Sequence, residues 1–541
     1  MVLGRVSRRA LLVGGWSVLG VPVLAACLGR ESKGKKKGGG SAASGGAGSG
    51  SAGASASASG SAGTSGGSGQ GVTRTVSTVG ATLKVTVGPA VVSNDVMVVP
   101  LAAHLDKAGS SSPSSSGFGL DLVWNGTDRY TGADGVRLVD FDAGTVQATF
   151  KASSESTLLM DKEPDVTLHA LFKPVDASTI NVLVPESGLF EGVPVVRDGK
   201  LSEDAKTALE NTYDTESSPD PVALETFTAS VDGASDTRVT GKSVTITLAS
   251  DVLFDSDSAD LSAQADTTLK KAADQLSTYP GGQVTIVGHT DDVADDAHNQ
   301  DLSQRRAQAV SDRLGQLASM SAYSVSVSGK GESEPRVPND SDENRQLNRR
   351  VEITLVPTQE SSTKSDADKD SGKSGGDLPK AEGPVAKGSE GVTVKRGGGD
   401  DKLTFVLKEV TRRGKYLVGE VKATGGPGGT KTGPADWLQP TQLAGSARGE
   451  EDTKLLGAVT GLSLLTTQTR YYPVDYTTTQ GAHHSLSEIT ADNKLGDGDA
   501  TTLTVVWPDT GQDTATLDLE PATGPTRPNN PFRLTNIPIK K

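Results

Sequence analysis

The sequence contains one cysteine in 541 residues, and aromatic side chains make up only 4% of it. A single cysteine excludes disulfides as a source of stability within the chain. The formal net charge of −14 argues against nucleic acid or an anionic membrane surface as the main partner of the folded part. Val, Leu and Thr nevertheless recur in short runs between tracts of Gly, Ser and Ala, which predicts several small β-rich domains joined by unstructured segments.

Patterns typical of catalysis, metal binding and cofactor binding are missing as well. No Gly-rich phosphate cradle leads into a helix, and neither a nucleophile elbow nor a Ser/His/Asp set is present. Metal-ligand spacing is absent at the histidines His289, His298, His483 and His484. We expect the adjacent His483 and His484 to be exposed. The sequence therefore predicts a binding protein without metal or cofactor, and not an enzyme.

The first 27 residues have the organisation of an export signal. Arginines at the start precede a short apolar run, residues 10–23, which ends in Leu24-Ala25-Ala26-Cys27. This segment resembles a bacterial lipoprotein signal with its lipobox. The resemblance implies that Cys27 is diacylated, for example with palmitate, and that the mature chain starts there. Residues 7–12 also resemble a twin-arginine signal without its later Lys, so twin-arginine and general secretory export both stay open.

Two segments are predicted to be disordered. Residues 28–74 consist largely of Gly, Ser and Ala, and residues 358–390 alternate Ser, Asp, Lys and Gly with few large apolar side chains. Such segments cannot bury enough apolar surface to fold. We expect the first to be a tether behind the signal and the second to be a linker between domains.

Residues 75–230 and 391–541 are each predicted to form an all-β sandwich domain, because short β-type runs alternate with turn residues in both. Similar landmarks recur in the same order: 83–87 with 403–407, 96–99 with 416–421, 139–141 with 474–476, 168–174 with 503–508, and 193–195 with 537–539. The second domain is therefore expected to be a duplicate of the first. Chance similarity between two β-rich sequences is the alternative.

Between residues 240 and 357 the patterns of strand and helix alternate. Apolar residues recur at helical spacing from Leu261 to Leu276, and a second helix is expected at 302–317. Strands are expected at 244–248, 284–287, 324–328 and 350–356. Crossovers between such strands need helices packed on one face of the sheet. The sequence therefore predicts a central α+β sandwich, flanked by the two all-β domains.

Five motifs stand out in this central segment: Phe254-Asp255-Ser256-Asp257, Gly288-His289-Thr290-Asp291, Asn299 with Leu302-Ser303 and Arg306-Ala307, Gly329-Lys330-Gly331-Glu332, and Asn348-Arg349-Arg350-Val351. Together they resemble the OmpA-like, or Pal-like, peptidoglycan-binding domain. The resemblance implies that Asp291 and Arg306 hold the diaminopimelate side chain of peptidoglycan. Loop 292–298 departs from the family pattern, because it is acidic and lacks the usual glycine, which leaves the rim of the pocket open.

The chemistry of Asp291 and Arg306 fits this ligand independently. Diaminopimelate ends in an ammonium and a carboxylate on one carbon, and an acid together with a planar bidentate donor can hold both groups. Arg306 also falls on the apolar stripe of its predicted helix, where a guanidinium needs a partner. Spacing alone leaves an alternative, in which Asp291 caps a turn and Arg306 forms an internal salt bridge with it.

Four further residues complete the predicted site. Thr290 and Asn299 are expected to be hydrogen-bonding neighbours of the ligand or caps. Leu302 belongs to the Leu-Ser segment that precedes Arg306. Arg350 begins the last strand directly after Arg349, and one of these two arginines is expected to support the pocket unless solvent covers both.

The sequence thus predicts a lipid-anchored cell-surface protein, on the extracytoplasmic face of the cell membrane, that binds peptidoglycan noncovalently and links the membrane to the wall. The two β-sandwich domains would be available to protein partners. In the alternative interpretation, the protein is a surface adhesion or sensor protein whose β-sandwiches carry the main activity.

Overall fold

The computed structural model describes residues 69–110, 123–124, 132–150, 160, 164–197, 199–210, 220–358, 377–396, 401–438, 458–479, 481, 483–489, 494–521 and 530–541. Cys27 and the predicted export signal lie outside the described residues, as does most of each predicted linker. Within these ranges, no helix has the length and apolar character needed to cross a membrane.

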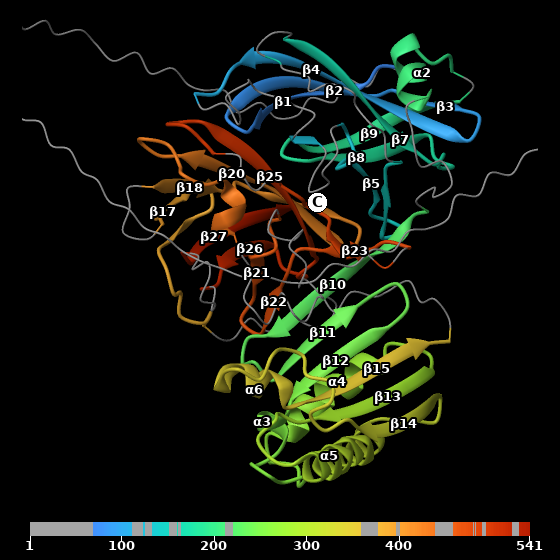
Figure 1. Cartoon of the computed structure of the whole chain (residues 1–541), viewed down its shortest axis with the longest axis vertical. Coiled ribbons are helices and arrows are strands. Elements are labelled where there is room, and N and C mark those ends of the chain that lie inside the picture. The colour runs from blue at the N-terminus through green and yellow to red at the C-terminus, as the bar shows by residue number, and fades with distance from the viewer. Residues whose placement is uncertain are drawn as a thin grey trace, which may run out of the picture. The chain divides into compact units, whose positions relative to one another are not determined.

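The described part of residues 72–210 is rich in β-strands and also contains helix α2 (Figure 1). Its elements are β1 (Val72–Thr78), β2 (Ala81–Val87), β3 (Ala90–Ser93), β4 (Val96–Lys107), β5 (Arg137–Asp140), β6 (Thr145–Ala148), β7 (Asp165–Phe172), β8 (Thr179–Val184), β9 (Gly188–Arg197) and α2 (Glu203–Glu210). Apolar and polar residues alternate along β2, so that Leu83, Val85 and Val87 all face the core. Trp124 and Phe172 are buried in the same core.

Residues 385–540 form a second β-rich region. Its elements are β16 (Val385–Lys387), β17 (Val392–Lys395), β18 (Lys402–Val406), β19 (Val410–Arg413), β20 (Tyr416–Gly425), the 3-10 helix η1 (Pro434–Trp437), β21 (Leu462–Leu465), β22 (Thr469–Tyr471), β23 (Asp475–Thr477), β24 (His483–Ser485), β25 (Ala500–Pro508), β26 (Thr514–Leu519) and β27 (Phe532–Lys540). Its core contains Trp437, Trp507 and a stacked pair of rings, Phe405 and Phe532, with centroids 4.8 Å apart. Aromatic residues are few in this chain, yet they concentrate where the sheets pack.

The strand pairings of the first region recur in the second. The antiparallel series β1–β2–β4–β7 has its counterpart in β17–β18–β20–β25. β3 pairs in parallel with β9, as β19 does with β27. A register shift lies between Ile180 and Val182 in β8, and another lies between Ala515 and Leu517 in β26. These matches support the predicted duplication, while the division of the chain into sandwich domains stays a prediction.

One landmark of the predicted duplication does not follow this correspondence. Val139 and Asp140 lie in β5, which pairs with β8, whereas Asp475 lies in β23, which pairs with β10 and β24. β26 pairs with β21 and β27, as β8 pairs with β5 and β9. By pairing, β21 and not β23 is the counterpart of β5. A match of three residues is too short to identify a strand, because many β sequences share it.

Strands paired in the order β10–β11–β12–β15–β13–β14 form the third region, and β10 also pairs with β6, β22 and β23 of the other two regions. Its strands are β10 (Val222–Ser230), β11 (Ser235–Val239), β12 (Val244–Ala249), β13 (Gly282–His289), β14 (Tyr323–Gly329) and β15 (Arg350–Pro357). Its helices are α3 (Ser250–Leu253), α4 (Ala265–Leu276), α5 (Asp296–Leu317) and α6 (Asp342–Asn348). The strands predicted after residue 240 are confirmed to within two residues at each end. β10 and β11 extend the sheet before that position.

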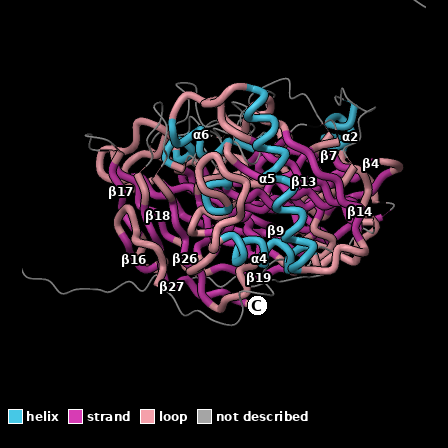
Figure 2. The backbone as a smooth tube through the Cα atoms, turned by 90° about the horizontal axis from the view of Figure 1, so that it is seen from below, coloured by secondary structure: helices cyan, strands magenta, loops and turns pink. Residues whose placement is uncertain are grey.

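Helices α4 and α5 pack together on the strands of this sheet (Figure 2). Val310 and Leu314 of α5 share a core with Ile286 of β13, as the apolar stripe predicts. Helix α5 begins at Asp296, ahead of the predicted start at residue 302. It starts early because the Asp295 side chain accepts a hydrogen bond from the backbone N–H of His298 at 3.0 Å, which caps the first turn.

Candidate functional site

The predicted ligand pair lies where three elements of the central sheet come together. Asp291 follows the end of β13, Arg306 projects from the middle of α5, and Arg349 immediately precedes β15. The loop after α3 contributes Phe254 and the backbone around Ser258. Residues distant in the sequence therefore form one polar cluster at an end of the strands.

Asp291 is held by Arg349. The Nη1 atom of Arg349 donates to Oδ2 of Asp291 at 2.7 Å, and the Asp291 side chain is 14% exposed. The other oxygen, Oδ1, accepts only a long hydrogen bond of 3.4 Å from the backbone N–H of Val293. This oxygen is the one best placed to accept a hydrogen bond from a ligand.

Arg349 also binds Asp251, so that it bridges two carboxylates. Its Nε donates to Oδ1 of Asp251 at 2.8 Å and its Nη2 donates to Oδ2 at 2.7 Å. The hydrogen bonds that Arg349 donates to Asp251, and after them the one to Asp291, raise the pKa of its guanidinium above its ordinary value, although burial opposes this. Arg349 thereby fixes the orientation of Asp291.

Arg306 is buried without a carboxylate partner. Only 4% of the residue is exposed, its Nε donates to the carbonyl of Ser258 at 2.8 Å, and its Nη2 makes a 3.4 Å contact with the carbonyl of Asp255. The guanidinium also lies over the ring of Phe254, 5.2 Å from its centroid. In the part of the chain that the structure describes, Arg306 forms no ion pair. The alternative of an Arg306–Asp291 salt bridge is therefore not what this structure shows.

Charges around Arg306 are balanced as a group. Burial lowers the pKa of the Arg306 guanidinium, and Arg349 lowers it further, whereas Asp251, and after it Asp257 and Asp291, raise it. Two carboxylates, Asp251 and Asp291, thus face two guanidiniums, Arg306 and Arg349. A site of this kind suits a ligand that carries both an ammonium and a carboxylate, because binding then leaves no excess charge buried.

The other predicted residues surround this cluster. Asn299 is buried, and its Nδ2 donates to the carbonyl of Asp291 at 3.2 Å and to Oε2 of Glu332 at 2.6 Å. Thr290 is also buried, and its Oγ1 has no hydrogen-bond partner among the described residues. Leu302 is buried on the same helix as Arg306. Asn299 therefore supports the backbone of Asp291, as a neighbour rather than an ion-pairing group.

The structure places Arg350 away from Asp291. Its Nε donates to Oε1 of Glu352 at 2.6 Å, and its Nη atoms donate to the carbonyls of Asn348 and Glu334. Successive side chains of a strand point to opposite faces, so only one of two adjacent arginines can reach the site. Arg349 is that residue. The sequence also did not single out Asp251, whose role depends on a contact far along the chain.

The acidic loop 292–298 is tied down by its own contacts. Asp292 pairs with Nε of Arg345 at 2.9 Å, Asp295 caps α5, and Nε2 of His298 lies 2.6 Å from Oδ1 of Asp257. The departure from the family pattern is therefore accommodated by contacts with α6 and with the loop after α3.

His289 is the last residue of β13, next to Thr290 and Asp291, and is buried. Both ring nitrogens are buried without hydrogen-bond partners among the described residues. Burial, and then the nearby Arg350, lower the pKa of His289 to about 4. Burial alone would raise the pKa of the Glu352 carboxyl, but Arg350 outweighs it and holds that pKa below its usual range. His289 is thus a neutral structural residue near neutral pH.

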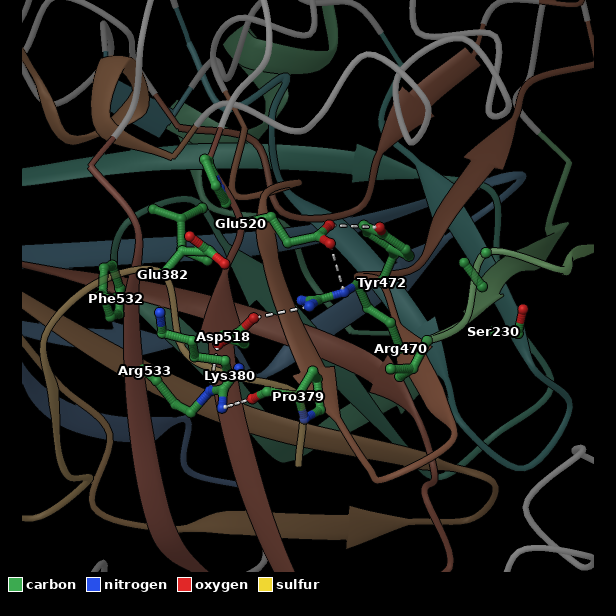
Figure 3. Close-up of a pocket in the computed structure, with 15 residues that line it drawn as sticks. Ser230, Pro379, Lys380, Glu382, Arg470, Tyr472, Asp518, Glu520, Phe532 and Arg533 are labelled. Atoms are coloured by element: carbon green, nitrogen blue, oxygen red, sulfur yellow. Dashed lines mark hydrogen bonds and ion pairs between the residues drawn. The ribbon is translucent and has the colours of Figure 1, made fainter. Parts of the chain in front are cut away.

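A separate cavity of about 400 Å³ lies beside β10, β22, β26 and β27 (Figure 3). Arg470 pairs there with Asp518 at 2.9 Å and with Glu520 at 3.1 Å. Tyr472 donates to Glu520, and Arg533 pairs with Asp518 at 2.6 Å. Arg470, Arg533, Asp518 and Glu520 thus pair with one another at the wall, and we assign this cavity no role in binding.

The histidines near the C-terminus differ from expectation. The side chains of His483 and His484 are only 11% and 18% exposed, so the prediction that this pair is exposed was wrong. Nε2 of His483 lies 2.8 Å from Oδ2 of Asp475, and Nδ1 of His484 lies 3.0 Å from Oε1 of Glu488. Both rings are largely buried and each contacts a carboxylate. The sequence did not indicate these contacts, because it shows only that the two histidines are adjacent.

Comparison with known proteins identifies the central segment. Residues 253–349 match the model of the OmpA family, so the chain contains an OmpA-like domain and the resemblance inferred from its motifs is confirmed. The chain is 42% identical over 105 residues to outer membrane porin F of Pseudomonas aeruginosa, a match that covers 19% of this chain and 30% of the porin. It is 36% identical over 125 residues to the probable lipoprotein YiaD of Escherichia coli, covering 23% and 56% of the two chains. The chain thus spans less than two thirds of the length of either relative.

Solved structures also match about a fifth to a quarter of this chain. The cell wall anchor of the T6SS from Pseudomonas aeruginosa is 33% identical, with a TM-score of 0.21, and the match covers 23% of this chain and 88% of that one. The peptidoglycan-associated lipoprotein from Burkholderia pseudomallei is 26% identical, with a TM-score of 0.17, and the match covers 21% and 87%.

Proposed function

We propose that this chain binds peptidoglycan noncovalently through its OmpA-like domain and so links the cell membrane to the wall. The observation that carries the proposal is the buried guanidinium of Arg306, which lacks a carboxylate partner among the described residues and lies near Asp291. A buried charge of this kind is costly unless a ligand or an ion pair compensates it. A carboxylate of the wall peptide would supply that compensation.

The ligand would bridge the two residues. Arg306 would donate hydrogen bonds to the carboxylate of the diaminopimelate side chain, and Oδ1 of Asp291 would accept hydrogen bonds from its ammonium. Arg349 would keep Asp291 oriented through its 2.7 Å contact with Oδ2. Thr290, Asn299 and Leu302 would shape the surrounding wall, while Arg350 would act only through the strand that it begins.

The remainder of the chain would serve this attachment. Cys27 would carry the lipid that holds the chain to the extracytoplasmic face of the membrane, as the lipobox predicts, and residues 28–74 would be the tether. The two β-rich regions would be duplicated sandwich domains available to protein partners. In this proposal the protein works by binding and catalyses no reaction.

The test is sedimentation of the full chain with purified peptidoglycan, followed by competition with free diaminopimelate. We expect the chain to sediment and to be released by diaminopimelate, but not by the amide of Nα-acetyl-lysine, whose side chain ends in an ammonium without a carboxylate. Sedimentation that diaminopimelate does not release would overturn the assignment of the ligand. Absence of sedimentation would favour the adhesion or sensor function, with the activity in the β-rich regions.

A further inference from the structure

We propose that Glu225, Asp475 and His483 form a binding site for a divalent transition metal of the Zn²⁺ class. One ligand atom from each of the three side chains lies within 4.8 Å of the others. The site is remote from Asp291 and Arg306 in sequence, and the proposed binding of peptidoglycan does not use it. It would fasten β10 of the central sheet to the hairpin formed by β23 and β24.

Strand register brings these residues to one face. Glu225 of β10 is directly opposite Asp475 of β23, and Asp475 is directly opposite Ser485 of β24. His483 is two residues before Ser485 and therefore points to the same side. Directly opposed residues have Cβ atoms about 4.5–5.5 Å apart, so the row converges on a small volume.

The ligand set is chemically consistent. Imidazole nitrogen and carboxylate oxygen are both ordinary zinc ligands, with bonds of about 2.0–2.2 Å, which sets tetrahedral ligand atoms about 3.4 Å apart. Nε2 of His483 is 2.8 Å from Oδ2 of Asp475, so a shift of a few tenths of an ångström would admit an ion. A mixed set of one nitrogen and two oxygens favours a borderline metal over Ca²⁺ or Mg²⁺.

Charge and burial point in the same direction. The side chains of Glu225 and Asp475 are only 8% and 3% exposed. Arg238 donates to Oε2 of Glu225 at 2.7 Å and neutralises one of the two carboxylates. Buried carboxylates are ordinarily paired or coordinate a metal ion.

Unpartnered polar atoms at this face are a second, independent observation. Ser485 is 2% exposed, and its Oγ has no hydrogen-bond partner among the described residues, although the register places it beside Asp475. Nδ1 of His483 is buried and equally without a partner in the described ranges. A hydroxyl in this position can donate to a metal-bound carboxylate or water, and such outer groups orient the ligands of metal sites.

The test uses the full chain, extracted in detergent, stripped with EDTA, dialysed and titrated with Zn²⁺. We expect one equivalent of zinc per chain by elemental analysis, a higher melting temperature with zinc, and a Co²⁺ absorption spectrum typical of mixed nitrogen and oxygen ligands. His483→Gln and Asp475→Asn should each weaken zinc binding at least 10–100-fold, the loss that removing even an outer-shell partner causes. If the unaltered chain does not bind zinc, the proposal is wrong.

The matched control is His484→Gln, on the neighbouring residue that points to the opposite face and contacts Glu488. We expect this variant to bind zinc as the unaltered chain does. Equal zinc binding by His483→Gln and the unaltered chain would mean that the ion sits elsewhere, and the proposal would fail. If a variant does not fold, as judged by circular dichroism, the Co²⁺ spectrum of the unaltered chain decides, since a spectrum of oxygen ligands alone contradicts a histidine ligand.

Discussion

Arg349 contacts Asp291 with one nitrogen, at 2.7 Å, while its other two nitrogens bind both oxygens of Asp251. One guanidinium therefore orients the acid that we propose to bind the ligand, and leaves Oδ1 of that acid with a single long hydrogen bond. Among the described residues, in contrast, Arg306 has only backbone carbonyls as acceptors. Asp291 is thus held by an ion pair with Arg349, whereas Arg306 has no carboxylate partner among the described residues.

Removal of either ligand-binding charge should weaken attachment to the wall. We expect Asp291→Ala and Arg306→Ala each to cost about 2–5 kcal/mol of binding, because truncation of one charge leaves its counterpart on the ligand unpaired. The double variant should lose less than the sum, since both residues bind the same ligand. Affinity for purified peptidoglycan measures this effect. Arg305→Ala is the control, because Arg305 is exposed and pairs with Asp301 on the outer side of α5.

The two ligand-site substitutions also separate binding from folding. Both variants should keep the circular dichroism spectrum of the unaltered chain. If Arg306→Ala unfolds the domain and Asp291→Ala binds the wall normally, then the two residues are structural and the ligand assignment is wrong.

Arg349 should act as a positioning residue. Arg349→Ala should weaken peptidoglycan binding by about 1–3 kcal/mol, because Asp291 loses a charge-assisted hydrogen bond. Arg349→Lys should be intermediate, since an ammonium cannot hold Asp251 and Asp291 with a planar fork. The measurement is affinity for peptidoglycan beside the melting temperature. Arg345→Ala, which removes a pair with Asp292 on the nearby loop, is the matched control, and an equal loss in that variant would contradict a specific role for Arg349.

The central sheet should need β10 and β11. A fragment of residues 220–358 should unfold at higher urea concentration than a fragment of residues 240–358. The shorter fragment loses Asp236, whose two oxygens pair with Arg336 at 2.8 and 3.1 Å in a largely buried position. Loss of one partner from a buried pair costs roughly 3 kcal/mol. Asp236→Ala in the longer fragment should reproduce much of the difference, and equal stability of all three proteins would show that the two strands are dispensable.

Lipid attachment should depend on one residue. Cys27→Ala should abolish incorporation of a palmitate analogue and release the chain from the membrane fraction, because this is the only thiol of the sequence. Labelling followed by fractionation measures both effects. A variant that still incorporates the label and stays with the membrane would disprove the lipobox assignment.

Acid should destabilise the central domain through His289. Its pKa in the folded chain is about 4, against 6.5 in the unfolded chain. Between these two pH values, the unfolded state therefore binds a proton that the folded state does not bind. The contribution of neutral His289 to the free energy of unfolding is therefore fully present above pH 6.5. It is lost as the pH falls towards 4, by up to about 3 kcal/mol. The charges around it are Arg350, Glu352, Glu334 and Lys330.

Comparison of the unaltered chain with His289→Gln isolates this contribution. Urea unfolding at pH 7 and at pH 4.5 should show a smaller acid loss in the variant. Carboxylates that do not interact with His289 titrate alike in both proteins, and parallel pH profiles would show that His289 is not the group responsible.

Local pattern determined much of what could be predicted from the sequence. Alternation of apolar residues located β12 to β15, and helical spacing located α4 and most of α5, because the period of side-chain burial is a property of each element by itself. The five motifs identified the OmpA-like domain, while the ligand-binding roles of Asp291 and Arg306 stay a prediction. The start of α5 was missed, since it depends on the cap at Asp295.

Tertiary structure alone decided which charges meet. Arg349 and not Arg350 reaches Asp291, because the direction of a strand's side chains is set by the sheet that it joins. Asp251 enters the site, and Glu225 meets Asp475, through strand pairings between distant segments. The sequence determined the elements and the family of the central domain, whose signals are local. The partners of its buried charges were decided by packing, because contacts between residues far apart in the chain leave no periodic trace in it.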